Sequence, residues 1–429
     1  MPSTRLNLSR RALTASAALL SVLAAFPAAA QDLAAAIADA MANAPLVAEA
    51  DAGAAAAKAR LDAARAEGNP LLRVEGSVGA GRIDNGGFFG ITADNVNPVG
   101  LQATAEMPLF AGGRIAAATA QARGGAEAAH QGAEGARRQL TLEVVAAYAD
   151  VLISRRMEDR YRGLLAALDE VARGAGLRFK TGDIAKSELA LAQARQAGAR
   201  AGLAQAEGRR ISAEARFERL TGKAPLGLAP LPAAPAVPAS LDEALDMARA
   251  SWPGLLQARA GLDAARAGVR AAHAESLPTV GVYAEAAHVR DQFFPGYRAD
   301  SASVGLRGRW TIFAGGRIAA KQREAGSELT ASEARLRGAG LALDGAVIDA
   351  WQAWQTAGKM VEAGRARADA AAEALRSTRL EAQVGAQPTL AVLDAEREAI
   401  EADAAAIEAE GNRLVAAWRL RALTGIAAP

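Results

Sequence analysis

The sequence predicts an α+β membrane protein built from two structural repeats. An octapeptide, FAGGRIAA, occurs at residues 110–117 and again at 313–320, 203 positions later. Short segments with alternating apolar side chains precede each copy, and proline-free stretches of more than 65 residues follow each copy. An internal repeat of this length indicates a tandem duplication, so any fold must use the same arrangement twice.

Residues 1–30 have the features of a signal peptide. Basic residues precede the apolar run 12–26, and Ala28-Ala29-Ala30 provides a small-residue cleavage site. The apolar run is too short for the usual membrane-spanning helix. Removal of residues 1–30 takes away three of the 49 basic residues and none of the 47 acidic ones, so the net charge gives no indication of nucleic-acid binding. Since the chain has no cysteine, we expect neither disulfides nor a lipid anchor.

The first repeat, residues 31–223, begins with an alanine-rich segment that has strong helix propensity. This segment covers residues 32–68, with Asp32 as its expected N-cap and Pro45 interrupting it. Glycine, asparagine and proline at 68–70 end it. The period of the apolar residues then changes from helical to alternating.

Four segments, two in each repeat, alternate apolar and polar side chains with the period of a β-strand. They cover about 72–80, 99–107, 280–287 and 302–310. Strands of about nine residues can cross a bilayer when tilted. Four such strands could equally form half of a soluble β-sandwich. The predicted loops, 81–98 and 288–300, carry aromatic residues that either constrict an extracellular mouth or lie at a membrane interface. These are Phe88, Phe89, Phe293, Phe294 and Tyr297.

A long helix is predicted after each octapeptide, because residues 113–180 and 316–387 contain no proline, and the two helices are expected to end at turns over 180–183 and 383–386. If continuous, each would be roughly 100 Å long. A turn and a return helix follow, and both return helices finish at Leu-Thr-Gly with glycine as the C-terminal cap. The proline-rich residues 224–239 then link the first repeat to the second, residues 240–429.

The octapeptide itself marks a junction between strand and helix. Its paired glycines could suggest phosphate binding, but duplication at this junction is better explained by a turn of the backbone. The residues of this junction motif are Phe110, Gly112, Gly113, Phe313, Gly315 and Gly316. We find no phosphate-binding loop, nucleophile elbow or histidine–carboxylate cluster at metal spacing, and we therefore expect neither enzymatic activity nor a cofactor.

Four amphipathic strands cannot remain an open sheet in lipid, because every unpaired backbone group there costs several kcal/mol. The smallest closed bacterial barrels have about eight strands. Strands from at least two chains must therefore close the barrel, and the long helices must project away from the membrane.

With these features the chain resembles the TolC family of outer membrane factors, over nearly its whole mature length. The resemblance rests on the double copy and on short motifs in a fixed order. These are PLFAGGR at 108–114, Ala147-Tyr148, RFKTG at 178–182 and LTG at the end of both halves. The second copy diverges, with Thr311 in place of Pro108, Trp351 in place of Tyr148, and LEAQVG at 380–385.

The resemblance implies a homotrimer whose twelve strands form one β-barrel in outer-membrane lipid. Twelve helices would continue as a hollow α-helical barrel in the periplasm, with a belt formed partly by the linker and the C-terminus. The two helix tips would dock a periplasmic adaptor (membrane fusion) protein, which connects to an inner-membrane transporter. The tip residues are Thr181, Gly182, Asp183, Val384, Gly385 and Ala386. The channel itself would be passive.

Acidic residues near the tips are the candidates for a gate. The family pattern has acids six and nine residues after the tip glycine of the second copy, where this chain has Ala391 and Asp394. The same spacing in the first copy leads to Glu188 and Leu191. We expect Asp394, with Glu188, to form a negative ring that favours cations when three chains converge. The alternative is that Asp394 is an ordinary solvated helix residue.

Asp183 also has two interpretations, because it could contact the adaptor or belong to local turn chemistry. Two functions remain open for the duct. One is efflux of drugs or solutes with a resistance-nodulation-division (RND) pump, and the other is type I protein secretion with an ATP-binding-cassette (ABC) exporter. A periplasmic adaptor is a third possibility, but it would need a lipoyl-like split domain and only one helical hairpin.

Overall fold

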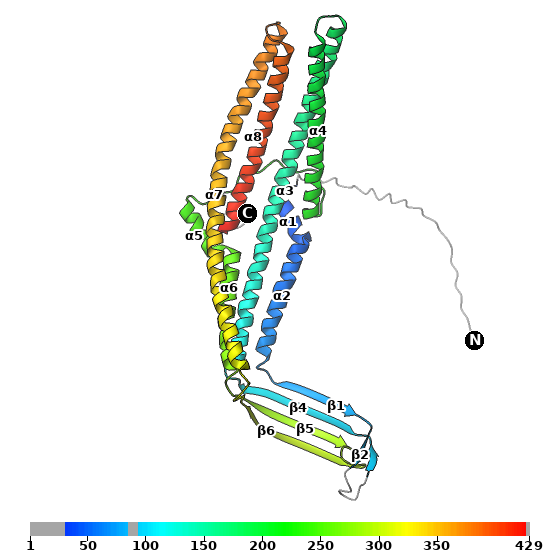
Figure 1. The fold of residues 1–429 in the computed structure, drawn as a ribbon, viewed down its shortest axis with the longest axis vertical. Coiled ribbons are helices and arrows are strands. Elements are labelled where there is room, and N and C mark those ends of the chain that lie inside the picture. The colour runs from blue at the N-terminus through cyan, green and yellow to red at the C-terminus, as the bar shows by residue number, and fades with distance from the viewer. Residues whose placement is uncertain (1–30, 85–92, 426–429) are drawn as a thin grey trace, which may run out of the picture.

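The computed structural model describes residues 31–84 and 93–425 as an elongated molecule (Figure 1). Two long helical hairpins run side by side with their tips at the same end, and a β-sheet lies at the opposite end. The predicted signal peptide, Phe88 and Phe89 lie outside the described residues.

Each repeat opens with an 11-residue helix followed by a 22-residue helix. These are α1 (Leu33–Asn43), α2 (Pro45–Ala66), α5 (Leu241–Ser251) and α6 (Pro253–Ala274). Pro45 and Pro253 occupy the first turn of α2 and α6, where the missing N–H of proline is tolerated. The segment predicted at 32–68 is therefore two helices, bent by 55° at the proline.

Side-chain caps fix where α1 and α5 begin. The Asp32 carboxylate accepts a hydrogen bond from the Ala35 N–H at 2.7 Å, as the sequence predicts for an N-cap. The Ser240 hydroxyl accepts one from the Glu243 N–H at 3.2 Å.

Among the described residues, α1 and α2 together reach the length and hydropathy of a membrane span, whereas no helix does so alone.

The long helices have the same lengths in both repeats. Helices α3 (Arg114–Lys180) and α7 (Arg317–Gln383) each have 67 residues, and their return helices α4 (Lys186–Thr221) and α8 (Thr389–Thr424) each have 36. At 1.5 Å per residue, α3 and α7 are roughly 100 Å long. Helix α2 packs on α3, and α6 packs on both α3 and α7. Since α4 packs on α3 and α8 packs on α7 toward the tips, each long helix has a neighbouring helix in both halves of its length.

The sheet combines strands from both repeats in the order β1-β4-β5-β6, and all neighbours are antiparallel. The strands are β1 (Leu71–Val78), β4 (Val99–Phe110), β5 (Thr279–Arg290) and β6 (Arg298–Arg309). The β4–β5 pairing joins the repeats, and it leaves β1 and β6 as the edges of the sheet within one chain. One cross-strand row consists of Leu72, Ala105, Ala284 and Val304.

Both predicted loops need correction. Within 81–98 the chain forms a small antiparallel ribbon of β2 (Gly81–Asp84) and β3 (Ala93–Val96). Within 288–300 both ends belong to strands, and only residues 291–297 form the turn. In the 288–300 segment the side chains on one face of the strands change from apolar to charged. The hydropathic alternation therefore stops although the strands continue.

Two buried hydrophobic clusters occupy equivalent places in the two repeats. Tyr148 and Phe217 lie in the first cluster, and Trp351 lies in the second. The hydroxyl of the fully buried Tyr148 lies 2.7 Å from the carbonyl oxygen of Ala229 in the linker and 3.1 Å from that of Gln31. Burial, reinforced by the negative charge of Asp32, raises the pKa of Tyr148 to about 12. The linker therefore packs against the middle of α3 and joins its core.

Candidate functional sites: helix tips, strand–helix junctions and the two faces of the sheet

The two helix tips are built by the same turn. At the first tip the Asp183 N–H donates to the Arg178 carbonyl at 2.9 Å. At the second, the Ala386 N–H donates to the Glu381 carbonyl at 2.9 Å. The glycine between helix and turn has φ of 82° at Gly182 and 77° at Gly385. These are glycine-terminated helix ends with a bond that spans five residues, and they require no side chain from elsewhere.

The side chains at the tips differ between the repeats. The Asp183 carboxylate accepts a hydrogen bond from the Thr181 hydroxyl at 2.9 Å, so Asp183 takes part in the local turn. In the second tip the equivalent pair is Val384 and Ala386, and Val384 is 80% exposed. The tips therefore present one polar and one apolar surface at the end of the molecule.

Asp394 forms an ion pair with the other hairpin. Its Oδ1 lies 2.9 Å from Nη2 of Arg195 on α4, and its side chain remains 48% exposed. The neighbouring Leu393 is buried against Leu168 of α3 and Ala199 of α4. Helix α8 therefore contacts both helices of the first hairpin at this level.

Glu188 lies in the first turn of α4, exposed and about one helical turn nearer the tip than the position equivalent to Asp394. Within the described part of the chain, no hydrogen bond or ion pair joins Glu188 to Asp394. Arg195 was not among the predicted site residues, because a partner 199 positions away leaves no local signal in a sequence.

The junctions between strand and helix need glycine for their backbone. At the first junction φ is 58° at Gly112 and 80° at Gly113, and at the second it is 58° at Gly315 and 85° at Gly316. Two consecutive left-handed residues cost little only for glycine. This geometry supports the interpretation of the octapeptide as a backbone turn.

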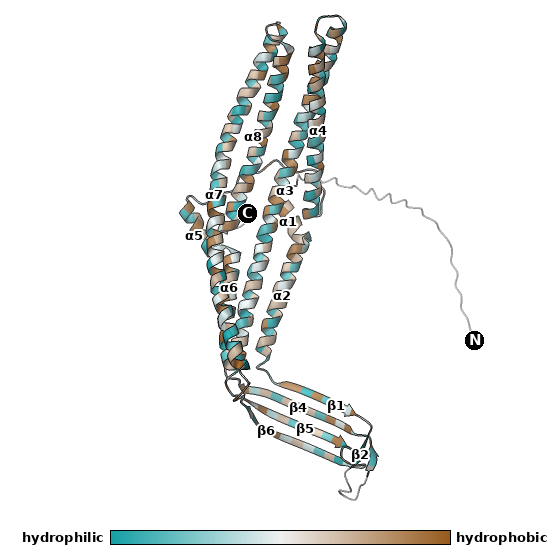
Figure 2. Cartoon of the chain, viewed as in Figure 1, coloured by the Kyte–Doolittle hydropathy of each residue, from teal (hydrophilic) through white to brown (hydrophobic). Residues whose placement is uncertain are grey.

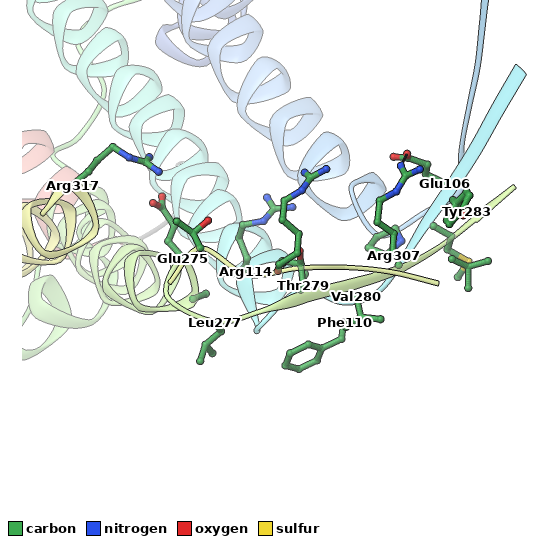
Figure 3. A pocket seen from close by; sticks show the side chains of 18 residues that line it. Glu106, Phe110, Arg114, Glu275, Leu277, Thr279, Val280, Tyr283, Arg307 and Arg317 are labelled. Carbon is green, nitrogen blue, oxygen red and sulfur yellow. Dashed lines mark hydrogen bonds and ion pairs between the residues drawn. The ribbon is translucent and has the colours of Figure 1, made fainter. Parts of the chain in front are cut away.

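A cavity of about 470 Å³ lies at the first junction, between the strand ends and the start of α3 (Figure 3). In Figure 3 the side chains of Arg114 and Arg307 point to one side, whereas Phe110 and Leu277 point to the other. Arg307 pairs with Glu106 at 2.8 Å and lies over the Tyr283 ring, 4.3 Å from its centroid. The two sides of the sheet thus differ in polarity already at this end.

The register extends this difference across the four barrel strands. One face carries exposed apolar side chains on every strand, including Leu72 (71% exposed) and Val304 (77% exposed). The other face carries polar groups in contact, such as the Gln102 amide that donates to Glu285 Oε1 at 2.6 Å. Each strand in Figure 2 shows the corresponding hydrophobic and hydrophilic bands. This is the pattern of a strand between lipid and an aqueous lumen.

Aromatic residues flank the strands at both ends. Near the helices, Phe110, Trp310 and Phe313 are all more than half exposed. In the β5–β6 turn, Phe293 and Phe294 pack edge-on against Tyr297, with ring centroids 5.1 and 5.3 Å apart. Aromatic girdles above and below an apolar band are typical of outer-membrane barrels.

A sheet with one lipid-type and one lumen-type face, continued by helices of roughly 100 Å, defines a membrane channel protein. The family model described as outer membrane efflux protein matches residues 36–223 and 244–426. The chain therefore belongs to the outer membrane efflux protein family.

Two curated relatives and one solved structure illustrate the similarity. Outer membrane efflux protein BepC of Brucella suis is 31% identical over 285 residues, which cover 66% of this chain and 62% of BepC. Protein CyaE of Bordetella pertussis is 30% identical over 289 residues, which cover 64% of this chain and 60% of CyaE. The CmeC outer membrane channel of Campylobacter jejuni superposes with a TM-score of 0.82 at 14% identity, covering 92% of this chain and 85% of CmeC.

These similarities confirm the predicted resemblance, the α+β fold with four barrel strands and two repeats per chain, and the outer-membrane location. The family and the fold are those of channel and transport proteins.

Proposed function

We propose that this protein is the passive exit duct of a tripartite export system. Three chains close their sheets into a twelve-stranded barrel in the outer membrane, and their helices form one tunnel into the periplasm. The tips dock a periplasmic adaptor, which connects the duct to an inner-membrane transporter. Energy for transport comes from that transporter.

The observation that carries this proposal is the shape of the single chain. Its sheet has a lipid-type face and two unpaired edges, which lipid does not tolerate unless the sheet closes. Its helices run from this sheet for roughly 100 Å and end in two solvent-exposed turns. A closed sheet on long helices is a conduit that reaches from one membrane toward another.

We favour small molecules as the cargo, exported with an RND pump. The matched family and the relative BepC are both described as outer membrane efflux proteins. Type I protein secretion with an ABC exporter is the second candidate, and it uses the same duct geometry. The two candidates differ in the partner that the tips contact.

Photo-crosslinking from the tips in the native cell tests the docking. A photoreactive residue at Val384 or Lys180 avoids the glycines, whose positive φ would be strained by a side chain. We expect both positions to capture a periplasmic adaptor, identified by mass spectrometry. The control is Leu341, which is 75% exposed in the middle of α7 and should capture only copies of this chain.

Capture of an adaptor encoded with a proton-driven pump would support efflux, and capture of one encoded with an ATP-driven exporter would support secretion. If neither tip captures an adaptor while Leu341 captures copies of the chain, the docking assignment is wrong.

We further propose that acids of the return helices line the entrance of this duct. Three copies of Asp394, together with those of Glu188, would place negative charge around a narrow pore and attract cations. The ion pair with Arg195 offsets part of the Asp394 charge, so the strength of the ring depends on that pair.

A further inference from the structure

The lipid-type face of the sheet changes character at the end remote from the helices. On β5 this face runs through Val280, Val282, Ala284 and Ala286 and then reaches His288 and Arg290. On β6 it runs through Leu306, Val304 and Ala302 and then reaches Asp300 and Arg298. On β5 and β6 the apolar band is therefore followed by two pairs of charged or titratable side chains, whereas β4 carries Leu101 and Val99 in the same two rows.

The register places these groups directly opposite each other. His288 faces Asp300, and their side chains are 2.6 Å apart between Nδ1 and Oδ1. In the next row Arg290 faces Arg298, and both are exposed. Like charges directly opposite each other on one face of a sheet are destabilising, so this pair needs a counter-charge.

The described part of the chain does not supply that counter-charge. Neither Arg290 nor Arg298 forms an ion pair with any described carboxylate, whereas the two nearest acids in the sequence of the hairpin are engaged. Asp300 contacts His288, and Asp291 accepts a hydrogen bond from the Gly296 N–H at 2.7 Å. Residues 85–92 contain no acidic residue.

The arginines lie at the level where lipid headgroups are expected. From Val280 to Arg290 the strand rises about 33 Å at 3.3 Å per residue. With a tilt of about 40°, this corresponds to roughly 25 Å along the membrane normal, the height of the apolar band of such barrels. Because the helices extend into the periplasm, the arginines lie at the outer leaflet.

The turn between the two arginines holds them in place. Residues 291–297 are closed by a hydrogen bond from the Asp291 N–H to the Tyr297 carbonyl at 2.8 Å. Phe293 and Phe294 both pack edge-on against the Tyr297 ring inside this turn. Two guanidinium groups on a closed hairpin form a preorganised clamp, and guanidinium binds phosphate with two parallel hydrogen bonds.

We propose that Arg290 and Arg298 bind phosphate groups of the phosphorylated glycolipid in the outer leaflet. The cationic pair and the apolar band below it match an amphiphile with an anionic headgroup and acyl chains. The aromatic turn above the pair would contact the sugar part of the headgroup. The site anchors the β5–β6 hairpin in the membrane and is independent of cargo and pump.

Binding of lipid A to the purified full-length protein in detergent tests this assignment. The probes are fluorescent lipid A with two phosphates, with one phosphate, and with none. We expect affinity to fall in that order, and the R290Q/R298Q variant to bind bis-phosphorylated lipid A about tenfold more weakly or worse, as expected for loss of charge-assisted hydrogen bonds. The matched control is R309Q, which removes an exposed arginine from the polar face of the same strand β6.

A second measurement separates lipid binding from a structural role. In lipid-free detergent, R290Q/R298Q should raise the unfolding temperature, because it removes like-charge repulsion. With bis-phosphorylated lipid A present, the wild-type protein should gain more stability than the variant. The assignment is overturned if R290Q/R298Q binds like the wild type, if R309Q is equally impaired, or if the dephosphorylated lipid binds equally well. Full competition by free pyrophosphate at the same concentration would overturn it in favour of a soluble-anion site.

Discussion

The two copies of the octapeptide offer a matched comparison of single residues. Gly112 and Gly315 have the same φ of 58°, but their surroundings differ. A Cβ added at Gly112 would lie 2.6 Å from the Cβ of Leu277, whereas one added at Gly315 would meet no atom within 4 Å in the same chain. The backbone requirement for glycine is thus common to both junctions, and the requirement for space belongs to the first.

Replacing these glycines by alanine should therefore give unequal losses of stability. Gly315→Ala should cost about 1–2 kcal/mol, the penalty for a side chain in the left-handed region. Gly112→Ala should cost more, by about 1–3 kcal/mol of overpacking, because Leu277 must move. Thermal unfolding of the purified variants, followed by circular dichroism, measures both. Equal losses would mean that the contact with Leu277 relaxes without cost.

At the scale of the elements, helices α4 and α8 meet through the Asp394–Arg195 ion pair. If Asp394 belongs to a negative ring, the two partners should have opposite effects on the pore. Asp394→Asn should weaken cation selectivity and divalent-cation block. Arg195→Gln should strengthen both, because it exposes the carboxylate. A pair this exposed is worth about 1 kcal/mol or less, so we expect changes in block of roughly two- to fivefold.

Single-channel recording in a salt gradient, with and without divalent cations, checks these signs. Glu398→Gln is the matched control, because Glu398 is an equally exposed acid of α8 whose partner, Arg367, lies on α7. If Asp394→Asn and Arg195→Gln change the block in the same direction, the pair acts only as a contact between hairpins. The charged-ring proposal would then be wrong.

The elements themselves differ in how far they could be predicted. The long helices could be predicted because propensity and the absence of proline act locally over residues 114–180 and 317–383. The strands could be predicted only while hydropathy alternates, and the prediction therefore stopped short of Arg290 and Arg298. The β2–β3 ribbon was missed because its glycine- and asparagine-rich sequence has the composition of a turn.

The candidate site residues likewise divide into those that local sequence predicts and those that it does not. The tip turns and the junction glycines follow from local chain geometry, and their positive φ values agree with the predicted turns. Arg195, the partner of Asp394, depends on how two hairpins pack, and a single sequence carries no record of a contact between positions 195 and 394. The charged row at Arg290 and Arg298 depends likewise on the register of β5 and β6.

At the scale of the whole molecule, the open edges of the sheet require several chains to close one barrel. Two chains would give eight strands, a barrel whose interior is just filled by side chains. Three chains give twelve strands and leave a lumen that helices can continue. In the proposed ring the contact is heterologous, with β6 of one chain beside β1 of the next, and rotation must close it.

Cysteine crosslinking across these edges tests the arrangement, and the chain has no native cysteine to interfere. Leu72 and Val304 lie at opposite ends of one cross-strand row and are both exposed on the lipid-type face. With a flexible bifunctional maleimide, the Leu72→Cys/Val304→Cys variant should give a ladder that ends at three chains. Each single variant should stay monomeric on a denaturing gel, because identical residues of neighbouring chains lie a full sheet width apart. Efficient crosslinking of a single variant would indicate edge-to-edge pairing of like strands. A ladder that ends at a number of chains other than three would mean a duct of a different size.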